Sequence, residues 1–517
     1  MSRAVSYHEM RDALDAACRD FANSGGLGDE GEQFSLADLS VLADGIADSL
    51  RAEGAEANEP VAVLVSNRAR DFAAFLGAWR ADCVVAPVHR GTPPLVLANL
   101  LERLGTRFVI DCLPASTAPA LKNYGLRGRK RGHVYVLDRP APAQRPLLEG
   151  AALIIFTSGT TGQPKGAVLS HRAFAGKLAA IDSLLRFGPH TRTLLVLQIT
   201  FSFGIWVGLL TLIKGGRLAV QERFSPERLL PGLLDHRASA VALVPTMLRA
   251  YLGASPEKAP PGELQRFNAL GCLGHLLTGG EPLGKPLAER AQGLFPGAAL
   301  VDIYGLTETC TSDFFLMPAD QAQHLGCIGR PSPGVEFRIA DEEGHPAAPG
   351  APGELQIRTP YIMSGYLDDP DITKAAFHEE YFRTGDLARE VAPGLVELVG
   401  RAKEMISRGA AKISPLEIEQ TFAGHPAVAE ALVTGVPDSL LGERIHIMIV
   451  LRRGQAAREE ELREWAASRL ERYKLPDRYH FGSELPLGRT GKADRAQLRE
   501  LLSGGKPQMH ADERELM

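Results

Sequence analysis

Cysteine, tryptophan and aromatic residues in general are scarce in this sequence. Its 517 residues include six cysteines and three tryptophans, and aromatic side chains make up 6% of the total. The cysteines form no CxxC pair and no cluster with histidine at zinc-site spacing, which argues against a disulfide framework or a structural zinc module. The first 20 residues also lack the apolar segment of a signal peptide. Both absences predict a cytoplasmic protein with free thiols.

An excess of charge of one sign is also lacking. The formal net charge is −5, whereas a nucleic-acid-binding protein needs a concentrated basic surface. Nucleic acid is therefore not an expected partner. Hydrophobic residues at 45% and charged residues at 23% are ordinary for a globular protein, and the chain is long enough for more than one domain.

One long uncharged run extends from Leu194 to Ile213, and its length would be enough to cross a membrane. Gln198, Thr200 and Ser202 interrupt its apolar character. This pattern favours a buried strand followed by a helix, and we expect no membrane span.

Apolar runs alternate with helical patterns through most of the chain. A β-α-β-α-β succession extends from Val61 to Ile110. Later short strands end at loops with polar residues or glycine: Pro245-Thr246, Gly279-Gly280-Glu281 and Tyr304-Gly305. Because ligands bind beyond the carboxyl ends of parallel strands, these loops are candidates for one site.

The character of the sequence changes twice towards its end. Residues 327–386 are rich in turns and short β runs, and a second unit begins after Gly400. We predict an α/β fold with a large N-terminal domain of parallel-type sheets, crossover helices and a β-rich subdomain, and a small mobile α+β C-terminal domain. The predicted bounds are 1–400, 401–502 and, for a mobile tail, 503–517.

The segment Thr157-Ser158-Gly159-Thr160-Thr161-Gly162-Gln163-Pro164-Lys165 has the composition of a phosphate-binding loop. Its glycines let backbone N–H groups approach an anion, and its hydroxyls and lysine add donors and a cation. It is not a Walker A loop, because Gly162 is not followed directly by lysine and serine or threonine. Taken alone, the segment would also fit a plain turn before a helix.

Together with four later motifs, this loop resembles the adenylate-forming (AMP-binding) superfamily, of the acyl-CoA synthetase and adenylation-domain type. The later motifs follow in the order of that family along nearly the whole chain: Ile303-Tyr304-Gly305-Leu306-Thr307-Glu308, Tyr381-Phe382-Arg383-Thr384-Gly385-Asp386, Gly400-Arg401-Ala402-Lys403 and Leu487-Gly488-Arg489-Thr490-Gly491-Lys492. The resemblance implies ATP and Mg²⁺ as cofactors and coenzyme A as co-substrate.

The resemblance also implies roles for single residues. Tyr304 would stack on adenine, and Asp386 would accept hydrogen bonds from the ribose hydroxyls. Glu308 would bind the Mg²⁺ on the ATP phosphates, and Lys492 would offset charge as the carboxylate attacks the α-phosphate. The predicted catalytic residues are Lys492, Thr307 and Glu308, and the predicted ATP or AMP contacts are Thr157, Ser158, Gly159, Thr160, Thr161, Lys165, Gly280, Glu281, Tyr304, Asp386 and Arg401.

A hinge at Lys403 and a thiol tunnel at Gly409 and Ala410 are implied for thiol transfer. Rotation at the hinge would alternate the faces that the small domain presents. The family has glycine at the second tunnel position, where this chain has Ala410, and the added methyl group would crowd a pantetheine arm. The sequence therefore supports adenylation more strongly than thiol transfer.

The segment Thr200-Phe201-Ser202-Phe203-Gly204 matches the substrate-gate region of the family. Ser202 stands where amino-acid-activating domains carry an aspartate for the α-amino group, so an α-amino acid is disfavoured. The predicted acid pocket consists of Phe201, Ser202, Phe203 and Gly280 and favours an apolar aliphatic or aromatic acid. Its aromatic residues would equally fit a plain core.

The sequence thus predicts an ATP-dependent acid–thiol ligase that forms acyl-AMP and then an acyl thioester, with coenzyme A as the acceptor. A stand-alone enzyme that loads the phosphopantetheine of an acyl carrier protein would use the same residues. Two further alternatives stay open: a non-catalytic nucleotide-binding regulator and a P-loop NTPase.

Overall fold

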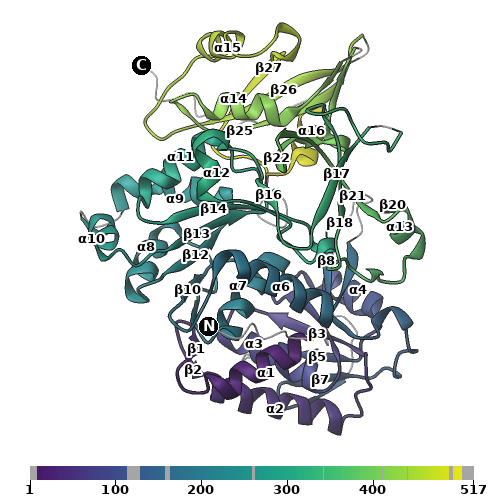
Figure 1. The fold of residues 1–517 in the computed structure, drawn as a ribbon. Helices are drawn as coiled ribbons and strands as arrows, with labels where there is room; N and C mark the ends of the chain where they lie inside the picture. Colours follow the sequence, from purple (N-terminus) through teal and green to yellow (C-terminus); the bar gives the residue numbers. More distant parts are fainter. Residues whose placement is uncertain are drawn as a thin grey trace.

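The computed structural model describes residues 9–112, 128–157, 164–258, 262–341, 343–409, 411–438, 440–487 and 493–503. Within these residues the chain forms a large body that extends to Arg401 and a smaller one that begins at Ile406 (Figure 1). The large body contains three sheets and the smaller one a fourth. This arrangement confirms the predicted fold class, although the sheets are mixed rather than wholly parallel.

An eight-stranded sheet forms from the region of the predicted β-α-β-α-β succession. Its strands, in spatial order, are β19 (Gly365–Tyr366), β9 (Lys165–Ser170), β8 (Ala151–Thr157), β4 (Val84–His89), β3 (Pro60–Val65), β5 (Phe108–Ile110), β7 (Val134–Leu137) and β6 (Gly128–Arg131). The four central strands are parallel and the strands at both edges are antiparallel. In β3, Val61, Val63 and Val65 face one core and Ala62 and Leu64 face another. A strand buried on both faces explains the continuous apolar run.

A nine-stranded sheet carries the loops predicted to form the site. Its strands, in spatial order, are β16 (Arg330–Pro331), β15 (Phe314–Leu316), β14 (Ala299–Tyr304), β13 (His275–Gly279), β12 (Ala240–Leu243), β10 (Arg192–Leu195), β11 (Arg217–Val220), β1 (Gly26–Gly28) and β2 (Gln33–Ser35). The strands from β14 to β1 are parallel, so their carboxyl ends share one edge.

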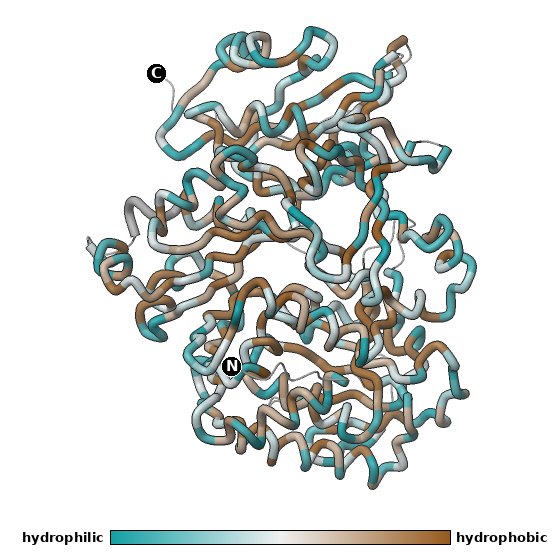
Figure 2. Tube along the Cα trace, in the orientation of Figure 1, coloured by the Kyte–Doolittle hydropathy of each residue, from teal (hydrophilic) through white to brown (hydrophobic). Residues whose placement is uncertain are grey.

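Helices join the two large sheets through one core and cover their outer faces. The shared core contains residues of both sheets and of α1 (Met10–Asp20), α2 (Leu36–Ala52), α3 (Ala69–Arg80), α6 (His171–Leu185) and α7 (Ser202–Ile213). The outer cores contain residues of α4 (Pro94–Leu104) on the eight-stranded sheet, and of α8 (Pro226–Asp235), α9 (Pro245–Lys258), α10 (Glu263–Leu270) and α11 (Lys285–Leu294) on the nine-stranded sheet. Figure 2 shows hydrophobic chain concentrated along the inner strands.

The uncharged run from Leu194 to Ile213 divides as predicted. Its first residues belong to β10 and its last twelve form α7, which is buried along almost its whole length. None of the helices in the described ranges is long and apolar enough to cross a membrane. The run is therefore interior sheet and helix.

A five-stranded sheet connects the large body to the smaller one. Its strands are β17 (Glu336–Ala340), β18 (Gly353–Arg358), β20 (Phe377–His378), β21 (Tyr381–Ala392) and β22 (Leu395–Arg401). Strands β21 and β22 are antiparallel, and their pairing places Asp386 opposite Arg401. The last strand of the large body therefore ends one residue beyond the predicted boundary at residue 400.

The smaller body is a sheet with helices on its two sides. It contains β23 (Ile406–Arg408), β24 (Ala411–Ile413), β25 (Val428–Asp438), β26 (Gly442–Leu451), β27 (Arg478–Gly482), α14 (Pro415–Ala423), α15 (Glu459–Ala467) and α16 (Arg495–Ser503). In Figure 1, α16 lies on the side that faces the large body and α15 on the far side. Helix α15 ends at Ala467, where the Ser468 hydroxyl donates to the Trp465 carbonyl and so competes with helix continuation.

Candidate functional site

The carboxyl ends of β12, β13 and β14 carry three of the predicted site loops. The Glu281 carboxylate accepts hydrogen bonds from the Thr246 hydroxyl at 2.8 Å and from the Arg249 guanidinium at 2.9 Å. Gly280 has a φ of +84°, a conformation that glycine adopts without strain. These loops therefore form one edge, with Glu281 held against the end of β12.

Tyr304, Asp386 and Arg401 form a hydrogen-bonded cluster. The Tyr304 hydroxyl donates to Oδ2 of Asp386 at 2.6 Å, and Nε of Arg401 lies 2.9 Å from Oδ1. Asp386 is 3% exposed; its burial raises its pKa, while the Arg401 charge and the Tyr304 hydrogen bond oppose that shift. Burial, together with Asp386, raises the pKa of Tyr304 well above its usual value. Each carboxylate oxygen has a second lone pair, so the fixed Asp386 can still accept ribose hydroxyls.

Glu308, in the turn that follows β14, and Lys165, at the start of β9, both contact Tyr366. The Tyr366 hydroxyl donates to Oε1 of Glu308 at 2.9 Å, and Nζ of Lys165 lies 5.0 Å from the centre of the same ring. Thr157 and Lys165 pair across the β8–β9 hairpin. The hairpin therefore brings both ends of the predicted phosphate loop to the predicted metal ligand. Burial and the neighbouring Glu308 raise the pKa of Tyr366, so its hydroxyl remains a donor.

The predicted acid pocket borders the predicted phosphate contacts. Oγ of Ser202 and Oγ1 of Thr307 are 3.4 Å apart. Phe201, which precedes α7, is 38% exposed. Phe203 stacks on Trp206 with the ring centres 5.7 Å apart, and Trp206 is completely buried. Trp206 thus supports Phe203 from inside the core.

Further apolar side chains follow the strands next to the predicted acid pocket. Val244 and Met247 follow β12, Leu306 precedes Thr307, and all three are half-buried against the same core as Phe203. Strand β12 lies between β10 and β13, so these side chains come from neighbouring loops. Phe203, Val244, Met247 and Leu306, called the apolar wall below, thus follow strands whose carboxyl ends share the edge that carries Thr307.

Six predicted residues lie outside the described ranges: Ser158, Gly159, Thr160, Thr161, Ala410 and Lys492. The flanks of the last are described, since Leu487 and Ala493 form an antiparallel bridge and the Asp494 amide donates to the Pro486 carbonyl at 2.8 Å. The two flanks of the segment that carries Lys492 are therefore paired with each other. Its predicted role stays a prediction.

The predicted hinge residue Lys403 lies in an exposed turn, η3 (Ala402–Glu404), between the two bodies. Close packing holds both sides of this turn. Ser414 donates to the Val399 carbonyl at 2.5 Å, and a Cβ atom on Gly400 would lie 2.9 Å from the Ser414 hydroxyl. The chain thus crosses between the bodies through a short exposed segment.

Other polar contacts join the two bodies or lie near the predicted tunnel. Nε of Arg249 lies 3.4 Å from Oε1 of Glu430 on β25, and burial raises the pKa of Glu430. Gly409, with a φ of +62°, donates its N–H to the Leu441 carbonyl at 2.7 Å. Arg249 therefore links Glu281 of the large body to the smaller body.

Tyr366 and Arg249 were not predicted as site residues. Tyr366 is 58 residues from its partner Glu308, and Arg249 is 32 residues from Glu281. The motif pattern contained no signal for either, because each acts through a contact between separate elements. Cys310, two residues after Glu308, was also overlooked; it is completely buried, and burial raises its pKa to about 12.

The donor set fits a nucleotide that brings its own metal ion. Among the described residues, no cluster of three or more His, Cys, Asp or Glu side chains is suited to hold a metal ion. Mg²⁺ favours one or two carboxylates together with phosphate oxygens and water. Glu308, beside Lys165 and the hairpin, supplies one such carboxylate.

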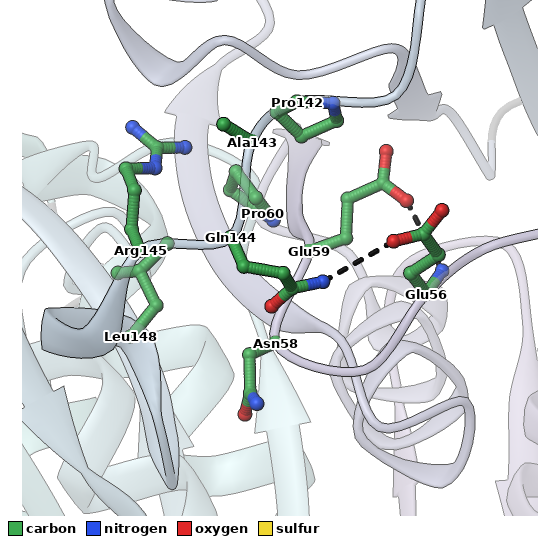
Figure 3. Close-up of a pocket in the computed structure, with 9 residues that line it drawn as sticks. All are labelled: Glu56, Asn58, Glu59, Pro60, Pro142, Ala143, Gln144, Arg145 and Leu148. Atoms are coloured by element: carbon green, nitrogen blue, oxygen red, sulfur yellow. Dashed lines mark hydrogen bonds between the residues drawn. The ribbon is translucent and has the colours of Figure 1, made fainter.

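A small pocket at the opposite end of β3 does not belong to this site (Figure 3). Its lining residues are Glu56, Asn58, Glu59, Pro60, Pro142, Ala143, Gln144, Arg145 and Leu148. The amide of Gln144 donates to Glu56 at 3.2 Å across it, and Arg107 pairs with the nearly buried Glu59 at 2.8 Å. Its empty volume of about 220 Å³, open solvent included, is below the roughly 300–1,000 Å³ of ligand pockets.

Comparisons with known proteins agree with this geometry. Residues 9–367 match the family model AMP-binding enzyme, and residues 417–492 match the AMP-binding enzyme C-terminal domain. Sulfoacetate–CoA ligase of Cupriavidus necator is 31% identical over 485 residues, which cover 91% of this chain and 93% of that protein. The fatty acid–acyl-carrier-protein ligase ScoC of Streptomyces coeruleorubidus is 29% identical, with 91% and 93% covered.

Solved structures are similar to this chain over nearly its whole length. The crystal structure of ATP-bound MatB from Rhodopseudomonas palustris superposes with a TM-score of 0.83 at 25% identity and covers 95% of this chain and 99% of that one. The two family models cover residues of both bodies. The chain therefore belongs to the AMP-binding, or adenylate-forming, enzyme family and is an acid–thiol ligase of the AMP-forming type.

Proposed function

We propose that the protein joins an apolar aliphatic or aromatic carboxylic acid to coenzyme A in two steps. In the first step, an oxygen of the carboxylate attacks the α-phosphorus of Mg-ATP, the bond to pyrophosphate breaks, and acyl-AMP forms. In the second step, the thiol attacks the acyl carbon, gives up its proton, and AMP leaves. Holding both reactants in line supplies much of the rate by proximity.

The single observation that carries the proposal is the adjacency of Thr307 and Ser202, whose hydroxyl oxygens are 3.4 Å apart. One belongs to the predicted phosphate contacts and the other to the predicted acid pocket. A carboxylate bound at the apolar wall would therefore meet a nucleotide bound at Tyr304 and Asp386. This is the juxtaposition that acyl-AMP formation needs.

Each residue then has a defined task. Asp386 holds the ribose hydroxyls while Tyr304 presents its ring to the adenine. Glu308 binds the metal ion of Mg-ATP, and Lys165 and the hairpin hold the phosphates. Lys492, brought in by residues 401–502 as a separate small domain, offsets the charge that develops in the first step.

The acid class is supported by the half-buried apolar side chains Phe203, Val244, Met247 and Leu306. A panel of aliphatic, aromatic, dicarboxylic and amino acids, scored by acid-dependent pyrophosphate release, tests this choice. We expect the highest kcat/KM for apolar acids. A preference for a dicarboxylic acid, or for a sulfonated acid such as the one named for the relative from Cupriavidus necator, would contradict it.

Transfer to a carrier protein is a second candidate, favoured by the similarity to a ligase that loads a fatty acid onto an acyl carrier protein. Parallel assays with free coenzyme A and with a phosphopantetheine-bearing carrier separate the two acceptors. Faster thioester formation on free coenzyme A is expected. Replacement of Ala410 by glycine in the same assay tests whether its methyl group slows the thiol step.

Two outcomes of these assays would revive the remaining alternatives. Nucleotide binding without pyrophosphate release for any acid would indicate a regulator, and acid-independent release of ADP would indicate an NTPase. We also propose a cytoplasmic location, which the six unpaired cysteines support.

A further inference from the structure

A buried ion pair lies behind the segment that contains Thr307 and Glu308. The side chains of Lys177, on α6, and Asp313 are both completely inaccessible to solvent, and Nζ of Lys177 is 2.7 Å from Oδ1 of Asp313. The ammonium also lies 5.2 Å from the centre of the Tyr361 ring. Replacing such a pair by apolar residues is often neutral or even stabilising. Stability alone therefore does not account for it.

Asp313 closes the loop on which the predicted metal ligand lies. Its backbone N–H donates to the carbonyl of Tyr304 at 2.7 Å. Its carboxylate accepts a hydrogen bond from the hydroxyl of Thr309, the last residue of η2 (Thr307–Thr309). One residue thus fixes both the start and the middle of the loop, and Lys177 anchors that residue to α6.

The backbone between Thr309 and Asp313 adopts an unfavourable conformation. Cys310, Thr311 and Ser312 have φ values of +56°, +76° and +51°, in the left-handed region that residues other than glycine avoid. Gly305 approaches this segment so closely that a Cβ atom on it would lie 2.0 Å from the Ser312 amide nitrogen. Such backbone persists only where its surroundings hold it, and the ion pair is the charged part of those surroundings.

The ion pair also connects the two predicted phosphate-binding segments. Strand β9 contains Lys165, and α6 follows it directly with Lys177. Asp313 belongs to the loop of Glu308, whose backbone carbonyl accepts from the Met363 amide at 2.7 Å. A shift of α6 relative to this loop would therefore change where the carboxylate of Glu308 stands relative to the phosphate hairpin.

We propose that Lys177 and Asp313 are positioning residues that hold Thr307 and Glu308 in the geometry required by the metal-bound phosphates of ATP. The proposal rests on the proposed function for the identity of the nucleotide complex. Neither side chain touches the nucleotide, because both are sealed from solvent. Their effect is exerted through the loop from Tyr304 to Asp313.

The test compares the binding of AMP, of ATP with Mg²⁺ and of ATP with a chelator, by calorimetry on the full chain. The double variant Lys177→Met, Asp313→Asn removes both charges and keeps the amide N–H and an acceptor for Thr309. Thr309→Val is a milder second variant. We expect folded variants with unchanged AMP affinity and roughly 10–100-fold weaker binding of ATP with Mg²⁺, the loss typical when a support of a metal ligand is removed.

The matched control is the ion pair of Arg107 and Glu59, whose glutamate side chain is 1% exposed. Figure 3 shows Glu59 in the lining of the small pocket at the other end of β3. Arg107→Met with Glu59→Gln should leave all three affinities unchanged. If Lys177 and Asp313 had a purely structural role, their double variant could change the melting temperature, but its ATP affinity would depend on Mg²⁺ as it does in the wild type and in the control variant. Thermal melts show which variants are folded.

The outcomes separate this inference from the proposed function. If either folded variant gains as much affinity from Mg²⁺ as the wild type, or if the wild type gains none, the inference is wrong. If the wild type binds ATP with Mg²⁺ but releases no pyrophosphate with any acid, the proposed function fails while the binding comparison still decides the positioning role. Should the double variant not fold, Thr309→Val gives the decision.

Discussion

The large body holds its site residues by buried contacts within itself, whereas the ion pair that joins it to the smaller body is partly exposed. Asp386 is 3% exposed and bound from two sides. The pair of Arg249 and Glu430 between the bodies has side chains that are 26% and 23% exposed. A buried carboxylate that is held by two partners keeps one geometry, whereas partly exposed ion pairs are weak and exchangeable. The proposed nucleotide site is therefore held in one geometry within the large body, and the weaker contact between the bodies supports the proposal that the smaller body changes its position.

The largest effect is expected from removing Lys492, the one catalytic residue that the smaller body is predicted to carry. Lys492→Ala should slow acyl-AMP formation about 10²–10³-fold, because the variant loses the cation predicted to offset the charge that develops between the carboxylate and the α-phosphate. AMP affinity should stay unchanged, since the large body alone would bind AMP. Acid-dependent pyrophosphate exchange and calorimetry measure the two quantities. Unchanged exchange would remove Lys492 from the mechanism.

The variant Asp386→Asn tests the proposed nucleotide site of the large body. Hydrogen bonds to charged groups contribute about 1.5–3 kcal/mol each, so AMP affinity should fall roughly 10–100-fold. Asp302→Asn is the matched control, because Asp302 is also a buried aspartate but bonds only to the Thr278 hydroxyl and the Ile303 amide among the described residues. Equal AMP affinity in both variants would show that Asp386 is structural.

Asp302 also gives a prediction about pH. Burial raises its pKa to about 7 from an ordinary value of 3.8, so the folded protein keeps a proton that the unfolded chain has lost. Stability from this proton is complete below the ordinary pKa and is lost as the pH rises through 7. Between pH 6 and pH 8 the wild type should lose about 1 kcal/mol of unfolding free energy relative to Asp302→Asn. Urea unfolding of both proteins at the two pH values measures the difference, and parallel curves would contradict it.

The smallest effect is expected at the contact between the bodies. Glu430→Gln should lower the population of the arrangement described here by at most about fivefold, because partly exposed ion pairs contribute 1 kcal/mol or less. Distances between spin labels on the two bodies report that population. Glu397→Gln is the control, since Glu397 pairs with Arg389 inside one sheet. A larger shift in the control would contradict the role given to Glu430.

Local patterns predicted the parts of the fold that depend on local physics. The β-α-β-α-β succession predicted from Val61 to Ile110 corresponds to β3, α3, β4, α4 and β5. The antiparallel strands β9 and β15, each next to an edge strand of its sheet, were not predicted, because strand direction depends on pairing between distant segments. The motifs predicted that Tyr304 and Asp386 act together, and the hydrogen bond between them agrees with that. Tyr366, Lys177 and Asp313 have no local signal, because each acts across a tertiary contact.

Burial of the thiols has a consequence for the fate of a reactive intermediate. Acyl-AMP acylates accessible thiolates, and the thiolate rather than the thiol is the nucleophile. Cys310, two residues after the predicted metal ligand Glu308, is completely buried and keeps its proton, because burial raises its pKa to about 12. The only cysteine that is not buried, Cys272, precedes β13 at the amino edge of the nine-stranded sheet, opposite the site. Acyl-AMP formed at the proposed site would therefore meet no exposed thiolate of Cys310, and its acyl group would stay available for the incoming thiol.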